Sequence, residues 1–169
     1  DKVGKNNSKG EYYLTDVIAC ARANGKYCTV FEAPADELQG VNSRSDLGRA
    51  ELIMQQRLRS RAFSSGVTLQ DPSTTWMCVD TRIGQDVTIE PNVVFGPGVV
   101  IGNGVLIRAF SHLEGVQIGA GAVIGPFARL RPGAVIGEGA RVGNFVEIKS
   151  ANVGAGVKIN HLSYIGDSR

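Results

Sequence analysis

Cysteine is scarce in this 169-residue sequence, which contains only Cys20, Cys28 and Cys78. Their number is odd and no two of them form a CxxC pair, so the sequence indicates neither a disulfide framework nor a zinc site. We therefore expect three buried, unpaired thiols.

Excess charge and long apolar runs are lacking as well. The net charge is only +2, which gives no electrostatic reason to expect nucleic-acid binding. No apolar run approaches the length of a membrane-spanning helix, and the opening DKVGKNNSKG lacks the apolar core of a signal peptide. We therefore expect a cytoplasmic protein without membrane insertion.

A six-residue repeat dominates the chain from Ile83 to Arg169. An apolar residue opens each of fifteen units, and glycine follows it in nine of them. The apolar positions are Ile83, Ile89, Phe95, Ile101, Ile107, Leu113, Ile118, Ile124, Leu130, Ile136, Val142, Ile148, Val153, Ile159 and Ile165. A fixed hexapeptide period predicts a parallel β-helix whose rungs bury these side chains in a column.

The repeat resembles the left-handed β-helix of the hexapeptide acyltransferases, in which three units close one triangular coil. By that resemblance the chain holds about five rungs. The units after Leu113 and Ile148 are one residue short, and we expect either a loop or a bulge at each.

The residues before the repeat have a different pattern. We predict a helix from about Glu11 to Ala23 and a strand over Tyr27 to Glu32. Apolar residues at helical spacing then predict a second helix over Ser43 to Ser65, with Ser43 and Asp46 forming a capping box. We expect Trp76 to begin an incomplete first rung and to cap the open end of the column.

Charge replaces the glycine at several corners of the repeat. Arg131 and Lys149 are 18 residues apart, so they should lie on successive rungs about 4.8 Å apart. A phosphate held by both cations and a surface ion-pair ladder with Glu114 are equally good explanations of this pair. The next rung carries His161 and Tyr164, which should approach the same edge. A neutral imidazole is suited to accept the proton of an attacking amine.

Several motifs resemble the bifunctional family of N-acetylglucosamine-1-phosphate uridylyltransferase and glucosamine-1-phosphate N-acetyltransferase. They are NSKGEYYLTD from Asn7 with GVNSR from Gly40, GPFARLRPG from Gly125, VGNFVEIK from Val142 and HLSYIGD from His161. The resemblance implies that His161 is the general base and that Arg131, Lys149 and Tyr164 bind glucosamine 1-phosphate. It also implies acetyl-CoA as co-substrate and a homotrimer with sites between neighbouring prisms.

The same resemblance implies three domains. Residues 1–42 would end a uridylyltransferase domain, 43–66 would form a linker helix, and 67–169 would form a truncated acetyltransferase β-helix. Asn42 would bind the nucleotide sugar and help to hold Mg²⁺ in that family, together with an upstream aspartate that is not in this chain. We therefore expect no uridylyl transfer from UTP by these residues alone, and an incomplete site for coenzyme A.

Two other interpretations remain open. A hexapeptide acyltransferase acting on a different amino sugar would have no reason to carry the GEYYLTD segment. An inactive oligomerising β-helix would tolerate changes at Arg131, Lys149 and His161.

Overall fold

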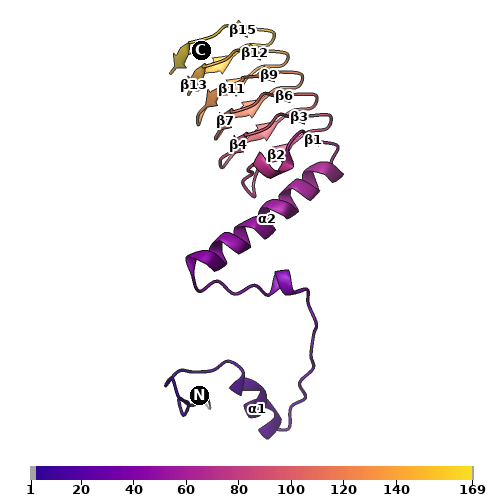
Figure 1. Cartoon of the computed structure of the whole chain (residues 1–169), viewed down its shortest axis with the longest axis vertical. Helices are drawn as coiled ribbons and strands as arrows, with labels where there is room; N and C mark the ends of the chain where they lie inside the picture. The colour runs from indigo at the N-terminus through magenta and orange to yellow at the C-terminus, as the bar shows by residue number, and fades with distance from the viewer. Residues whose placement is uncertain (1–2, 169) are drawn as a thin grey trace. The chain divides into compact units, whose positions relative to one another are not determined.

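The computed structural model describes residues 3–168, and the chain divides after Gly40 into two compact units. The first unit contains the α-helix α1 (Asp16–Ala23) and the short 3₁₀ helix η1 (Ala35–Glu37) (Figure 1). The predicted helix therefore begins later than Glu11. The predicted strand over Tyr27 to Glu32 is wrong, because that segment is irregular. Tyr27 and Phe31 are almost fully exposed, and a strand needs a partner that this segment lacks within its own unit.

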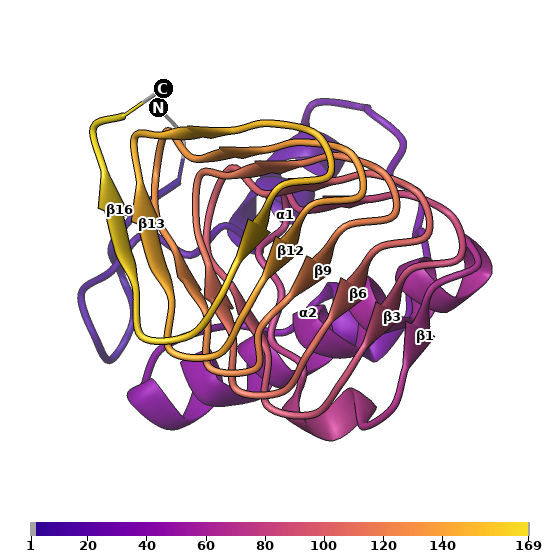
Figure 2. The same cartoon turned by 90° about the horizontal axis from the view of Figure 1, so that it is seen from above.

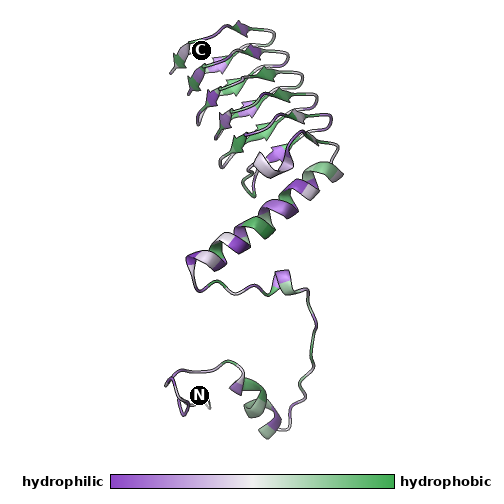
Figure 3. Cartoon of the chain, viewed as in Figure 1, coloured by the Kyte–Doolittle hydropathy of each residue, from purple (hydrophilic) through white to green (hydrophobic). Residues whose placement is uncertain are grey.

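The second unit opens with the long helix α2 (Arg44–Ser64), close to the predicted range. The predicted capping box is confirmed: the Ser43 hydroxyl accepts a hydrogen bond from the Asp46 backbone N–H at 3.1 Å, and the Asp46 carboxylate accepts one from the Ser43 backbone N–H at 3.0 Å. Figure 3 shows α2 with hydrophilic and hydrophobic residues interspersed. No helix among residues 3–168 is long and apolar enough to cross a membrane.

The repeat forms a parallel β-helix with three sheets, which confirms the predicted fold (Figure 2). Sheet A contains β1 (Thr68–Leu69), β3 (Thr88–Ile89), β6 (Leu106–Ile107), β9 (Val123–Ile124), β12 (Arg141–Val142) and β15 (Lys158–Ile159). Sheet B contains β4 (Val94–Phe95), β7 (His112–Leu113), β10 (Arg129–Leu130), β13 (Glu147–Lys149) and β16 (Tyr164–Gly166). Sheet C contains β2 (Arg82–Ile83), β5 (Val100–Ile101), β8 (Gln117–Ile118), β11 (Val135–Ile136) and β14 (Asn152–Val153). A second 3₁₀ helix, η2 (Pro72–Thr74), connects the first strands.

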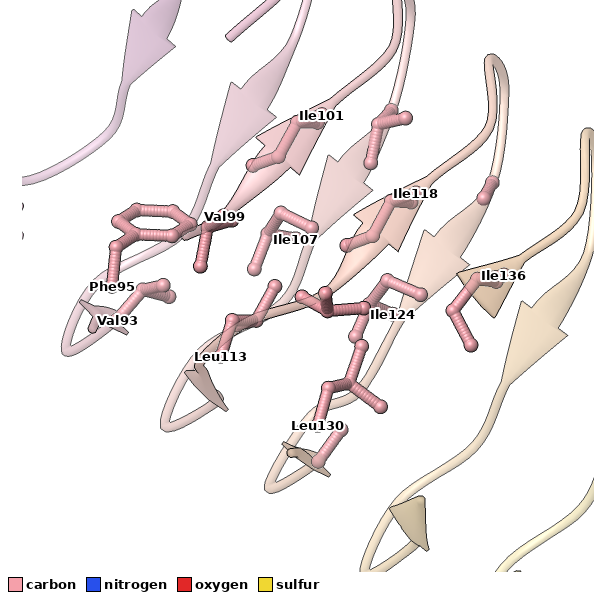
Figure 4. Packing of buried hydrophobic residues seen from close by; sticks show 14 of the residues in the cluster. Val93, Phe95, Val99, Ile101, Ile107, Leu113, Ile118, Ile124, Leu130 and Ile136 are labelled. Carbon is pink, nitrogen blue, oxygen red and sulfur yellow. The ribbon is translucent and has the colours of Figure 1, made fainter. Parts of the chain in front are cut away.

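The core is the column of apolar residues that the period predicts. The second residue of nearly every two-residue strand points inward, as Ile107, Leu113, Ile124 and Leu130 do in Figure 4. The first residue of the strand points outward and stays accessible, because side chains alternate along a strand. Partner strands are paired in register, so the outward side chains also form columns. These outward columns contain the charged and polar side chains of the strands.

The lower end of the column differs from the prediction. The first strand is Thr68–Leu69, which pairs with Thr88–Ile89, so the first rung begins before Trp76. Trp76 forms a parallel bridge with Val94 on the outside of sheet B, and Met77 is the buried residue of that segment. The end of the column is covered instead by α2, whose Leu58 and Ala62 belong to the buried core.

The two short units lie at the same corner, where the chain passes from sheet B to sheet C. Gly115 and Ser150 have positive φ angles of 54° and 44° there, and the full-length unit between them has Gly133 at 81°. Backbone hydrogen bonds join these corners, from Gly133 N–H to Gly115 O and from Ser150 N–H to Pro132 O. Each missing residue is therefore absorbed by a tighter corner, and the strands on both sides keep their register.

The cysteines are less buried than predicted. None forms a disulfide, as expected, but Cys28 is exposed and Cys20 and Cys78 are only partly covered. Cys20 and Cys28 lie in the first unit, which has no buried residue among those described. A unit without a core cannot bury a thiol.

Candidate active site

Sheet B places three of the predicted site residues on neighbouring rungs. Leu130 pairs with Ile148, so Arg131 and Lys149 follow each other at the corner between sheets B and C, as the spacing predicts. Tyr164 is in register with Glu147, and Gly166 is in register with Lys149. The Tyr164 hydroxyl lies against Gly166, where a larger residue would collide with it. Tyr164 is exposed, so its phenol is available to a ligand.

Both cations at this corner have carboxylate partners. The Arg131 Nη1 atom lies 2.8 Å from Glu147 Oε1, and the Arg129 Nε atom lies 3.9 Å from the same oxygen. The Lys149 Nζ atom lies 3.6 Å from Asp167 Oδ2. These partners differ from Glu114, the carboxylate that the repeat places in the same column as Arg131. Glu147 lies on the outward face of the next rung and reaches Arg131 diagonally.

These ion pairs are partly exposed and exchangeable. The side chains of Arg131 and Lys149 are 38% and 39% exposed. Ion pairs at such positions contribute about 0–1 kcal/mol each, so a dianionic phosphate could displace the carboxylates. The corner can therefore exist as an ion-pair ladder and still bind a phosphate.

His161 lies at the other corner of its rung, where the chain passes from sheet A to sheet B. It is exposed and lines a hollow of about 470 Å³ together with Arg108, Arg141, Lys158 and other residues of sheet A and its corner. Arg131, Lys149 and Tyr164 do not line this hollow. Within one chain, the structure thus brings three of the predicted residues together and places His161 beyond the far edge of sheet B.

An aromatic ladder stands at the same corner as His161, and sequence reasoning missed it. The rings of Phe110, Phe127 and Phe145 are stacked, with centroids 4.9 and 5.0 Å apart. All three residues have positive φ, and Leu162 continues the column with φ of 56°. The recurrence of phenylalanine two residues after the corner position was the signal that could have revealed it.

Asn42 lies just before α2 and is exposed. Its backbone N–H donates to Asp46 Oδ2 at 3.2 Å, an oxygen that also accepts from the Ser43 hydroxyl at 2.8 Å. These hydrogen bonds, chiefly the one from the Ser43 side chain, lower the pKa of Asp46. Residues 3–168 contain no group of three acidic, histidine or cysteine residues that could hold a metal ion. The residues around Asn42 therefore do not make a Mg²⁺ site by themselves.

Comparison with known proteins adds to this geometry. Residues 80–115 and 115–150 match the family described as bacterial transferase hexapeptide (six repeats). The fold resembles the acetyltransferase domain of PglB from Neisseria gonorrhoeae FA1090, solved in complex with acetyl coenzyme A. That match has a TM-score of 0.54 at 21% identity and covers 66% of this chain and 58% of the other. At this identity it supports the fold alone.

Curated relatives match over the whole chain. The bifunctional protein GlmU of Paramagnetospirillum magneticum is 59% identical over 169 residues, which are 100% of this chain and 38% of that protein. The protein of the same name from Rhodospirillum rubrum is 59% identical over 99% of this chain and 37% of its own length. The chain thus spans less than two fifths of these relatives. The resemblance predicted from the sequence is confirmed: over its whole length the chain matches one part of the bifunctional GlmU proteins, and its β-helix carries the bacterial transferase hexapeptide repeat.

Proposed function

We propose that this chain is the acetyltransferase part of a bifunctional enzyme that makes UDP-N-acetylglucosamine in the cytoplasm. The observation that carries the proposal is the 59% identity to a bifunctional GlmU protein over the entire chain. The reaction would transfer the acetyl group of acetyl-CoA to the 2-amino group of glucosamine 1-phosphate. Uridylyl transfer from UTP would need further residues, since residues 3–168 provide no acidic cluster with which Asn42 could hold Mg²⁺.

In the proposed reaction the amine nitrogen of glucosamine 1-phosphate attacks the thioester carbonyl of acetyl-CoA. The imidazole of His161 accepts the proton that the amine loses, the C–S bond breaks, and coenzyme A leaves as a thiol after protonation. His161 is exposed, which leaves its imidazole accessible to a bound substrate. Arg131 and Lys149 would exchange Glu147 and Asp167 for the sugar phosphate, and Tyr164 would orient the sugar ring.

The placement of these residues supports a shared site. His161 and the Arg131–Lys149 corner lie at opposite edges of sheet B, so one prism does not gather them around a single small substrate. If the sheet A–B corner of one prism meets the sheet B–C corner of another, the base and the phosphate-binding pair come together. This arrangement agrees with the homotrimer that the resemblance implies.

The partner carboxylates also favour a second candidate, an inactive oligomerising scaffold. Arg131 and Lys149 are each paired with a carboxylate of this chain, so their stacking does not by itself require a phosphate. The two candidates differ in whether His161 and Lys149 affect a reaction.

The test measures acetyl transfer from acetyl-CoA to glucosamine 1-phosphate through the release of the coenzyme A thiol. The Rhodospirillum rubrum relative is the positive control. We expect His161→Ala to lower kcat by about 10²–10⁴-fold, the usual contribution of a general base. His112→Ala is the matched control, because His112 is the only other histidine and is also exposed on the β-helix. Equal activity of the two variants would overturn the assignment of His161.

A second variant tests the phosphate corner. Lys149→Ala should weaken binding of glucosamine 1-phosphate by about 1–3 kcal/mol, the loss of one charged hydrogen bond. An unchanged dissociation constant would favour the scaffold. Transfer by the relative but not by this chain would assign completion of the site to parts of the relative outside the matched 37% of its length.

A further inference from the structure

The hollow beside His161 contains an excess of positive charge. Its lining includes Arg108, Arg141 and Lys158, together with the amide side chains of Asn144 and Asn160, and we call these residues with His161 the cationic hollow. No aspartate or glutamate lines it. The hollow is therefore a concentration of hydrogen-bond donors without a carboxylate to accept from them.

The register of sheet A brings two of these cations together. Arg141 in β12 is directly paired with Lys158 in β15, and both are outward residues of their strands. Directly paired residues of neighbouring strands lie about one strand spacing, ~4.8 Å, apart. Like charges placed opposite each other in a sheet are destabilising unless an anion lies between them.

The cationic hollow and the Arg131–Lys149 corner differ in whether their cations are paired with carboxylates. At that corner, ion pairs join Arg129 and Arg131 to Glu147, and Lys149 to Asp167. Arg108, Arg141 and Lys158 have no ion pair of this kind within the described part of the chain. The corner thus has internal counterions, whereas the hollow has none.

The shape of the hollow leaves the donors accessible. Arg108 and Asn160 stand in one corner column, and the two positions between them are Gly125 and Gly143, linked rung to rung by backbone hydrogen bonds. A Cβ at Gly125 would collide with the Ser111 hydroxyl oxygen and one at Gly143 with the backbone of Asn160, so the packing of neighbouring rungs requires glycine at both positions. Arg108, Arg141, Lys158 and Asn160 are all exposed, so a ligand can reach them from solvent.

We propose that the cationic hollow binds a phosphate group of a substrate directly beside His161, through Arg141, Lys158 and Arg108. Guanidinium and ammonium groups are the usual protein donors to phosphate, and the arginine fork can bind two phosphate oxygens at once. The inference rests on the proposed function for its choice of ligand. In the proposed reaction Arg131 and Lys149 hold the phosphate of the amino sugar, so the phosphate at the hollow is one that coenzyme A carries.

The two histidines provide a direct readout. Their imidazole protons can be followed by NMR while a phosphate compound is added, and His112 serves as an internal control because it lies outside the hollow. The probes are glucosamine 1-phosphate, glucosamine, adenosine 3′,5′-bisphosphate and adenosine. We expect adenosine 3′,5′-bisphosphate to shift the His161 signal and leave His112 unchanged. A response to glucosamine 1-phosphate but not to the bisphosphate would overturn the choice of coenzyme A.

The decisive variant is Arg141→Gln with Lys158→Gln, which should raise the dissociation constant of the active probe at least tenfold. The double variant Arg49→Gln with Arg82→Gln is the matched control, because it removes the same charge from exposed positions outside the hollow. Equal affinity of the two variants, or a His161 signal that no probe shifts, would overturn the proposal. Binding is measured without acetyl transfer, so transfer that His161→Ala leaves unchanged would contradict the proposed function, while a probe that still binds would leave the cationic hollow in place.

Discussion

The side chain of Gln55 in α2 forms hydrogen bonds with the backbone of Met77 in the first turn of the β-helix. It is 2% exposed, and its Nε2 atom donates to the Met77 carbonyl oxygen at 2.7 Å. Its Oε1 atom accepts from the Met77 backbone N–H at 2.9 Å. The amide thus satisfies both backbone groups of a buried residue that has no complete strand partner at this end of the column.

We expect Gln55→Ala to destabilise the protein by about 2–4 kcal/mol, because it leaves two buried backbone groups without a partner and opens a cavity. The measurement is urea unfolding followed by circular dichroism. Gln56→Ala is the control, since Gln56 is the neighbouring residue and is exposed. If both variants unfold at the same urea concentration, water replaces the amide and the bridge is dispensable.

For individual residues, the sequence predicts the rung on which a side chain lies better than it predicts the residue with which that side chain forms an ion pair. The repeat places Arg131 and Lys149 on adjacent rungs because register follows from the period alone. The choice of Glu147 over Glu114 depends on the rotamers of long side chains, which the period does not specify. A different factor separates His161 from the Arg131–Lys149 corner. His161 lies between sheets A and B of its coil, whereas the two cations lie between sheets B and C.

The N-terminus of α2 is the clearest case of an element defined by local chemistry. The Asp46 carboxylate accepts hydrogen bonds from the Ser43 side chain and from the backbone of Asn42 and Ser43, and these lower its pKa below 3.8. The unfolded chain therefore binds the Asp46 proton more readily than the folded chain does. Stability from this group is present above pH 3.8 and is lost as the pH falls through the lowered pKa of the folded state.

We expect Ser43→Ala to lower the free energy of unfolding by about 1 kcal/mol at pH 7, the usual cost of removing a helix cap. The difference from the unchanged protein should shrink as the pH falls from 3.8 through the lowered pKa of Asp46, because protonation of this carboxylate weakens the capping box. Thermal unfolding at pH 7 and pH 3 measures both effects. Ser45→Ala is the control, because Ser45 lies two residues after Ser43 and is exposed; this variant should show neither the loss of stability nor its pH dependence. A constant difference at both pH values would mean that Asp46 does not contribute through its charge.

The elements of the first unit were harder to predict. The pattern over Tyr27 to Glu32 is rich in β-formers, but β-propensity mainly describes how a side chain packs on a sheet. No strand is present among residues 3–40 for this segment to pair with. The helix predicted from Glu11 begins only at Asp16, after a turn. α1 buries none of its residues, so no packing contact stabilises a longer helix.

At the scale of the whole molecule, the period determines the β-helix but not its end. Each rung is predictable because it repeats its neighbour, and the buried column follows from it. The cover of the first rung has no repeat from which to predict it. Trp76 has the size expected of a cap, yet the strand register assigns it to the outward face and gives the covering position to Leu58 and Ala62 of α2.

The distribution of burial predicts which part of the molecule determines its stability. Every buried hydrophobic residue of the described part of the chain lies between Leu58 and Val153, and none of residues 3–40 is buried. Because burial of apolar surface is the dominant favourable term in folding, residues 1–40 should contribute little to the unfolding transition of the second unit. We therefore expect residues 41–169 alone to unfold at the same temperature as the full chain, within about 2 °C.

The matched comparison is a chain that also lacks α2 and begins at Val67. It should unfold at a lower temperature or fail to fold, because removing Leu58 and Ala62 exposes the end of the column and removing Gln55 leaves Met77 without its hydrogen bonds. Thermal unfolding of the three chains by calorimetry separates the contributions. A midpoint for residues 41–169 well below that of the full chain would show that the first unit stabilises the β-helix despite burying no residue of its own. Equal midpoints for all three chains would show that α2 is dispensable and that the rungs are stable without a cover.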